Sequence, residues 1–148
     1  MQLQLDRFTT PLGELLGRMI DLDRLRRCLD EGHLRALGIT ASSYTSGQHV
    51  TYYESRAPIE PWYRNQRLAS PTRLEIAHLL ASSAIPFVFP AVPLQLNDRH
   101  EFFGDGSMRQ TAPISPAIHL GAGRILVIGA GQLERGTPHA SHTGSQYL

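Results

Sequence analysis

The 148-residue sequence has little cysteine, little net charge and no long apolar run. Its single cysteine, Cys28, excludes an internal disulfide framework and favours a reducing compartment, which predicts a cytoplasmic location. A formal net charge of +1, with the arginines spread along the chain, gives no basis for nucleic-acid binding. The longest mostly apolar run, 84–96, contains three prolines and is too short to span a bilayer. No basic stretch followed by an apolar run opens the chain, so no secretion signal is expected.

The composition nevertheless supports a folded domain. Hydrophobic residues make up 41% of the chain and charged residues 18%, which is enough apolar material for a core. We expect an irregular lead-in over residues 1–20, where threonine, proline and glycine interrupt the pattern, and a flexible tail over 131–148, which is rich in glycine, histidine, serine and threonine. Residues 21–130 are expected to form the structured part.

The first half of that part predicts a helix followed by a hairpin. Residues 21–31 place leucines on one helix face, with Asp21 as the N-cap and Gly32 as the stop. Residues 34–44 and 50–53 favour strands, and the Thr-Ser-Gly-Gln turn between them predicts a hairpin. The polar and aromatic stretch 56–68 is interpreted as a surface connection.

The second half predicts alternating helices and strands. A helix is expected to begin at Ser70, as cap, and to end at Pro86, and the run 86–90 is expected to be extended because of its prolines. A strand over 100–103 and a helix over 113–120 follow. The continuous apolar run 124–128 predicts a buried parallel strand. This order favours an α/β domain, and so short a set of strands indicates a piece of a larger sheet.

The strongest local feature is an aspartate between two glycines, directly after the predicted strand at 100–103. Gly104 and Gly106 permit close backbone approach around Asp105, and Ser107 follows. Strand ends are where open α/β sheets place ligands, and an aspartate there can accept a proton from a hydroxyl. The alternative interpretation is a simple Asp-Gly turn between a strand and a loop.

Four segments in order carry a family resemblance. Segment 81–86 reads Ala-Ser-Ser-Ala-Ile-Pro, and Gly104-Asp105-Gly106-Ser107 follows after a strand. Segment 111–117 then reads Thr-Ala-Pro-Ile-Ser-Pro-Ala, and Gly-Ala leads into the strand at 124–128. This succession, over roughly residues 34–130, resembles the second half of the patatin-like phospholipase family.

The resemblance implies a partial three-layer α/β/α sheet that lacks the nucleophile-bearing half. In that family a serine in a Gly-x-Ser-x-Gly elbow attacks a lipid ester and an aspartate activates it, so Asp105 is expected to be the general base of a Ser/Asp dyad. Gly106 is its turn partner, and Ser107 stands where glycine or alanine is usual. No serine of this chain has the elbow pattern, and the glycine-rich oxyanion loop is absent.

The resemblance therefore implies a fragment of a lipid acyl hydrolase that is inactive by itself. Its expected partners are a lipid ester substrate, the missing N-terminal half of the domain and, at its periphery, a membrane; no cofactor or metal is expected. The alternative is a non-catalytic remnant that binds lipid or a protein partner.

Other patterns have simpler interpretations. Gly129-x-Gly131 after an apolar run suggests a dinucleotide-binding turn, but Glu134 occupies the third glycine position. His139 and His142 lie in the predicted tail and show no metal-site spacing. His119 is interpreted as a helix-end residue, and Ser82 and Ser83 as capping or packing residues. The stretch 62–64 (Trp-Tyr-Arg) is an anchored surface loop, an interaction patch or a lipid-facing lip.

Overall fold

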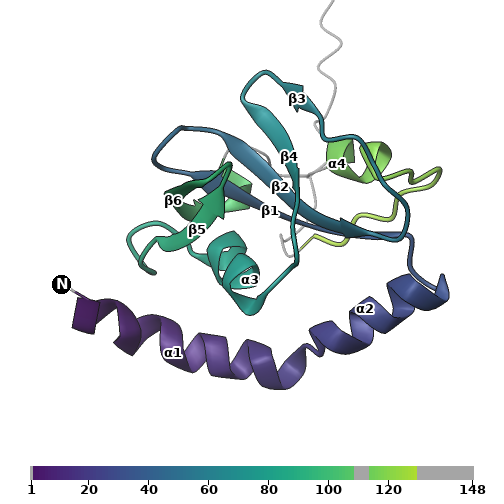
Figure 1. Ribbon diagram of the computed structural model, residues 1–148. Coiled ribbons are helices and arrows are strands. Elements are labelled where there is room, and N and C mark those ends of the chain that lie inside the picture. The colour runs from purple at the N-terminus through teal and green to yellow at the C-terminus, as the bar shows by residue number, and fades with distance from the viewer. Residues whose placement is uncertain (1, 109–113, 130–148) are drawn as a thin grey trace, which may run out of the picture.

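The computed structural model describes residues 2–108 and 114–129. Its centre is one six-stranded mixed sheet with the strand order β3-β4-β2-β1-β6-β5 (Figure 1). The strands are β1 (Ala36–Ser43), β2 (His49–Ser55), β3 (Tyr63–Arg64), β4 (Arg67–Pro71), β5 (Val92–Leu96) and β6 (Arg99–Asp105). The helices of the described residues are α1 (Gln2–Met19), α2 (Leu22–Glu31), α3 (Ile76–Ser83), the 3-10 turn η1 (Gly106–Met108) and α4 (Ile114–His119). The general α/β class is confirmed.

The first residues of the chain differ from their prediction. Residues 2–19 form helix α1, so the irregular lead-in expected over 1–20 is wrong. Pro11 lies inside this helix, although proline removes one backbone hydrogen bond there. Helix α1 packs along α3, where a Cβ added at Gly13 would stand 3.5 Å from the Leu80 Cδ1 atom. This tertiary contact outweighs the weak local propensity on which the prediction depended.

Helix α2 and the first hairpin confirm their predictions. The Asp21 side chain accepts a 2.8 Å hydrogen bond from the Arg24 N–H, and Gly32 ends α2 in a left-handed conformation. Strands β1 and β2 pair antiparallel from Ala36 opposite Ser55 to Ser42 opposite His49. Caps and turn residues close together in the sequence were therefore sufficient to predict the secondary structure of this part of the chain.

Two further hairpins were not predicted. β3 joins β4 through Asn65 and Gln66, and β5 joins β6 through Asn97 and Asp98, and all four turn residues have positive φ. The connection expected over 56–68 therefore contains β3 and the beginning of β4. β5 escaped prediction because Pro93 argues against a strand, yet β5 lies at the sheet edge, where a missing N–H is tolerated.

Helix α3 begins later than predicted. Ser70 and Pro71 belong to β4, because β4 pairs parallel with β2 and places Ser70 opposite Tyr52. The N-cap is Glu75, whose N–H donates to the His78 Nδ1 atom over 3.0 Å. Burial lowers the pKa of His78 below its ordinary value, which favours the neutral imidazole that this cap requires.

The segment after α3 is a turn. The N–H groups of Val88 and Phe89 both donate to the Ile85 carbonyl, so the extended conformation predicted for 86–90 is wrong. These local hydrogen bonds close the chain on itself before it enters β5.

The buried parallel strand predicted over 124–128 is also wrong. Residues 125–128 belong to no strand, and their side chains are between 40% and 89% exposed. A continuous apolar run becomes a buried strand only where neighbouring strands cover it. Within the described residues, no strand lies beside this run.

Helices lie on both faces of the sheet. Side chains of Ile39, Ala41 and Tyr52 belong to the core cluster that packs against α3. Because strand side chains alternate, Gly38 and Thr40 belong to the opposite face, where they line a pocket with α4 residues. The candidate site lies where β6 ends.

Candidate functional site

Asp105 is the last residue of β6, as the strand-to-loop prediction required. It pairs with Ala41 of β1, a strand in the interior of the sheet, and its N–H donates to the Ala84 carbonyl over 2.9 Å. This hydrogen bond joins the end of α3 to the end of β6. The backbone at Asp105 is therefore held by two separate elements.

The Asp105 carboxylate is oriented by its own turn. Oδ1 accepts a 2.8 Å hydrogen bond from the Ser107 N–H, and Oδ2 accepts a 2.7 Å hydrogen bond from the Ser107 hydroxyl. The Asp105 side chain is half-buried and Ser107 is exposed. No ion pair within the described part of the chain engages Asp105. A carboxylate has about four lone-pair positions, so this one retains acceptor capacity.

Tyr44 packs directly over Gly104, which sequence reasoning missed. A Cβ at Gly104 would lie 1.9 Å from the Tyr44 hydroxyl oxygen, so only glycine leaves room for the phenol. The Tyr44 N–H donates to the Phe102 carbonyl over 2.8 Å and fixes this placement. Burial, together with the negative charge of Asp105, raises the pKa of Tyr44 above its ordinary value. No local pattern connects Tyr44 with the Asp-Gly motif, because their contact exists only across the β1–β6 pair.

Gly106 is required for a different reason. A Cβ there would stand 2.4 Å from the Thr40 carbonyl oxygen, which is backbone and cannot swing aside. We expect Gly106→Ala to lower the free energy of unfolding by about 2 kcal/mol. Gly104→Ala should lower the free energy of unfolding by less, because the Tyr44 side chain that the new methyl group meets can rotate away. Urea denaturation of both variants measures the difference, and an equal or reversed order contradicts this geometry.

A buried Ser–His pair lies behind the site and is not part of it. Ser42 Oγ is 3.2 Å from His49 Nδ1, and both residues are at most 5% exposed. Ser42 pairs with Gly104, whereas Asp105 pairs with Ala41, so the Ser42 and Asp105 side chains belong to opposite sheet faces. Ser42, His49 and Asp105 therefore do not form a catalytic triad.

The other predicted residues have structural roles where they are described. Ser83 donates its hydroxyl to the Leu79 carbonyl of its own helix. His119 stacks on Trp62 with ring centroids 4.6 Å apart, and Trp62 stacks on Tyr53 at 5.8 Å. Trp62 thus anchors α4 to the sheet, which favours the anchored-loop interpretation over a lipid-facing lip.

Several predicted features lie outside the described residues. These are residues 111–113 of the proline segment, the dinucleotide-like glycine at 131, the tail at 131–148 and its histidines. The rest of the proline segment is described, and α4 (Ile114–His119) confirms the helix predicted over 113–120. Their predictions stay predictions.

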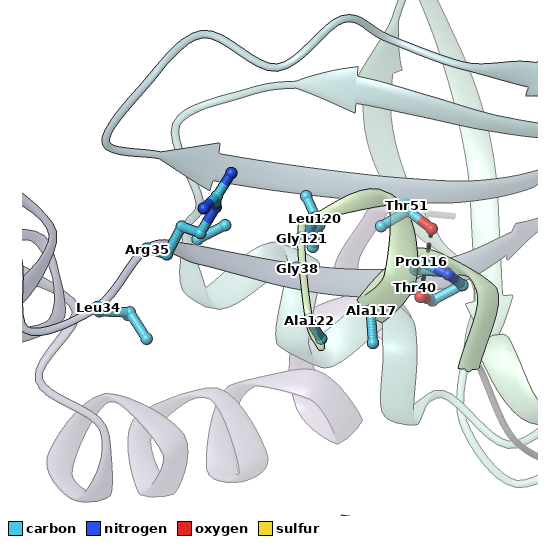
Figure 2. A pocket seen from close by; sticks show the side chains of 11 residues that line it. Leu34, Arg35, Gly38, Thr40, Thr51, Pro116, Ala117, Leu120, Gly121 and Ala122 are labelled. Atoms are coloured by element: carbon cyan, nitrogen blue, oxygen red, sulfur yellow. Dashed lines mark hydrogen bonds between the residues drawn. The ribbon is translucent and has the colours of Figure 1, made fainter. Parts of the chain in front are cut away.

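A largely apolar pocket of about 390 Å³ lies between β1, β2 and α4 (Figure 2). The Thr40 and Thr51 hydroxyl oxygens are 3.5 Å apart, and Figure 2 shows them beside Pro116. The lining residues are Leu34, Arg35, Ala36, Gly38, Thr40, Thr51, Pro116, Ala117, Leu120, Gly121 and Ala122. Asp105 is not among them, so this pocket and the carboxylate are separate features.

Two further findings concern the described residues only. They contain no group of three or more histidine, cysteine, aspartate or glutamate side chains placed to hold a metal ion. No described helix combines the length and the apolar character needed to cross a bilayer.

Comparison of this chain with protein-family models, with curated proteins and with solved structures finds no match.

Proposed function

We propose that this chain is the aspartate-bearing part of a patatin-like Ser/Asp acyl hydrolase that acts on lipid esters. Asp105 is the general base, and the nucleophilic serine comes from a segment outside this sequence. The observation that carries the proposal is the half-exposed Asp105 carboxylate at the end of an interior strand, oriented by Ser107 and free of ion pairs within the described residues.

In the proposed step, the carboxylate accepts the proton of a serine hydroxyl as its oxygen attacks the ester carbonyl. The two hydrogen bonds from Ser107 hold the Asp105 oxygens in place, so little reorganisation is needed. A carboxylate in water is a weak base, and it becomes effective only beside the hydroxyl in a shielded site. The serine-bearing segment would supply both the hydroxyl and the shielding.

The exposed apolar run supports the proposal. The four consecutive apolar residues 125–128 are between 40% and 89% exposed, which is unusual for a run of large apolar side chains. A strand from the serine-bearing segment beside this run would remove these side chains from water. Without such a strand, we expect the isolated chain to aggregate.

The second candidate is a non-catalytic remnant that binds lipid or a protein. The exposed apolar side chains favour it equally, because they fit a binding surface as well as an incomplete sheet. Reading the coding sequence upstream of Met1 separates the two. A Gly-x-Gly-x-x-Gly loop and a Gly-x-Ser-x-Gly elbow in the same frame favour the enzyme, and their absence favours the remnant.

The biochemical test compares the ester hydrolysis of the chain alone with that of the chain together with a serine-bearing segment. We expect the purified 148-residue chain to release no p-nitrophenol from p-nitrophenyl esters above the buffer rate. Co-expression with a segment that carries the elbow should produce turnover. Turnover by the chain alone that Asp105→Asn abolishes would contradict the need for an external serine.

A further inference from the structure

The connection between α3 and β5 (Figure 1) carries apolar side chains that are exposed to solvent. Phe87 is completely exposed, Val88 is 62% exposed and Ile85 is 50% exposed. The surrounding run, 84–96, contains no charged residue. We call Ile85, Phe87 and Val88 the apolar tip.

The conformation of Phe87 makes this exposure unusual. Its φ is +65°, a region that a bulky side chain rarely adopts and that glycine adopts freely. The turn therefore holds an aromatic side chain outward in a conformation that glycine would suit better. Outliers of this kind gather at ligand-binding and functional sites.

Most backbone N–H groups of the turn already donate hydrogen bonds to carbonyls of the same segment. The Ile85 N–H donates to the Ser83 carbonyl, and the Val88 and Phe89 N–H groups donate to the Ile85 carbonyl. Pro86 and Pro90 have no N–H. A segment enters an apolar phase at low cost only when its polar backbone groups are paired internally, and this turn largely meets that condition.

The apolar tip is also held in a defined position relative to Asp105. The residue before it, Ala84, is buried and accepts the Asp105 N–H at 2.9 Å. Ala81, in the last turn of α3, is fully buried in the core. The tip therefore projects from a buried base whose backbone is hydrogen-bonded to the backbone of Asp105.

We propose that the apolar tip inserts into the surface of a lipid bilayer and brings Asp105 to that surface. The inference rests on the proposed function, because a hydrolase of membrane lipids meets its substrate at an interface.

A strand of another protein cannot add here, because the two prolines and the internal hydrogen bonds leave too few backbone donors. A second copy is disfavoured by size: three side chains offer about 400 Å², whereas a stable dimer buries about 800 Å² per partner.

The test measures partition of the full chain onto phosphatidylcholine vesicles by flotation, in which vesicle-bound chain rises and aggregated chain stays at the bottom of the gradient. Phe87→Gly removes the aromatic ring and relieves the positive φ, so the fold should be retained. We expect this variant to bind vesicles about tenfold more weakly than the unmodified chain, and Phe87→Gly with Val88→Ser more weakly still. Circular dichroism melting confirms that each variant is folded.

The matched control is the other exposed apolar run. Leu126→Ser with Ile128→Ser should leave vesicle binding unchanged. Equal binding by Phe87→Gly and the unmodified chain, loss of binding only in the 126/128 variant, or a concentration-dependent dimer that Phe87→Gly abolishes would each overturn the proposal.

Binding and catalysis are separable in this design. Asp105→Asn should bind vesicles as the unmodified chain does, because the tip does not use the carboxylate. If the proposed hydrolase activity is never found, the vesicle result still stands or falls by itself.

Discussion

Asp105→Asn is expected to lower ester turnover about a thousandfold in the enzyme assembled from this chain and a serine-bearing segment. The amide cannot take up the serine proton, so the hydroxyl stays a poor nucleophile. The fold should be unaffected, because the asparagine carbonyl can still accept the Ser107 N–H bond that Oδ1 accepts at 2.8 Å. The effect should fall on kcat rather than on KM, because proton transfer belongs to the transition state.

Ser107→Ala is the control for this prediction. The Ser107 hydroxyl is 2.7 Å from Asp105 Oδ2 and exposed, so it is the rival nucleophile within the chain. Its loss should change turnover less than about tenfold, because the Ser107 N–H bond still orients the carboxylate. A loss as large as that of Asp105→Asn would identify Ser107 as the nucleophile and contradict an external serine.

The second large effect concerns stability. Phe103 is 0% exposed and meets Tyr52 edge-to-face with ring centroids 5.6 Å apart. Phe103→Ala leaves a cavity between the sheet and α3, and we expect it to lower the free energy of unfolding by about 4 kcal/mol. Since small domains are stable by only about 5–15 kcal/mol, urea denaturation should show a large shift of the midpoint.

The neighbouring phenylalanine is the matched control. Phe102 points to the other face of β6 and is 53% exposed, so Phe102→Ala should change the free energy of unfolding by about 0.5 kcal/mol. Equal effects of the two substitutions would mean that the register of β6 against β1 is wrong.

The sequence allowed prediction of the features that depend on residues close together in the chain. Asp21 and Gly32 bound α2 as predicted, because capping uses atoms within one helical turn. The β1–β2 hairpin followed from its turn, and the Asp-Gly motif was correctly placed at the end of a strand. In each case the sequence signal lies within a few neighbouring residues.

Features that depend on distant partners were predicted wrongly or missed. Ser70 carries a helix-cap signal, yet it belongs to β4 because β2 lies parallel beside it. Pro93 argues against a strand, yet it lies in β5, because an edge strand tolerates a residue without an N–H. The apolar run at 125–128 predicted burial, but burial requires a neighbour, and no described strand is one.

The sequence by itself thus determined the general α/β class and the position of Asp105 at the end of a strand, because alternation, capping and turn chemistry are local. Only the tertiary structure decided that Tyr44 covers Gly104, that Ala84 joins α3 to Asp105, and that Phe87 is fully exposed. These contacts join residues far apart in the chain, and their energies depend on which surfaces meet when the sheet forms.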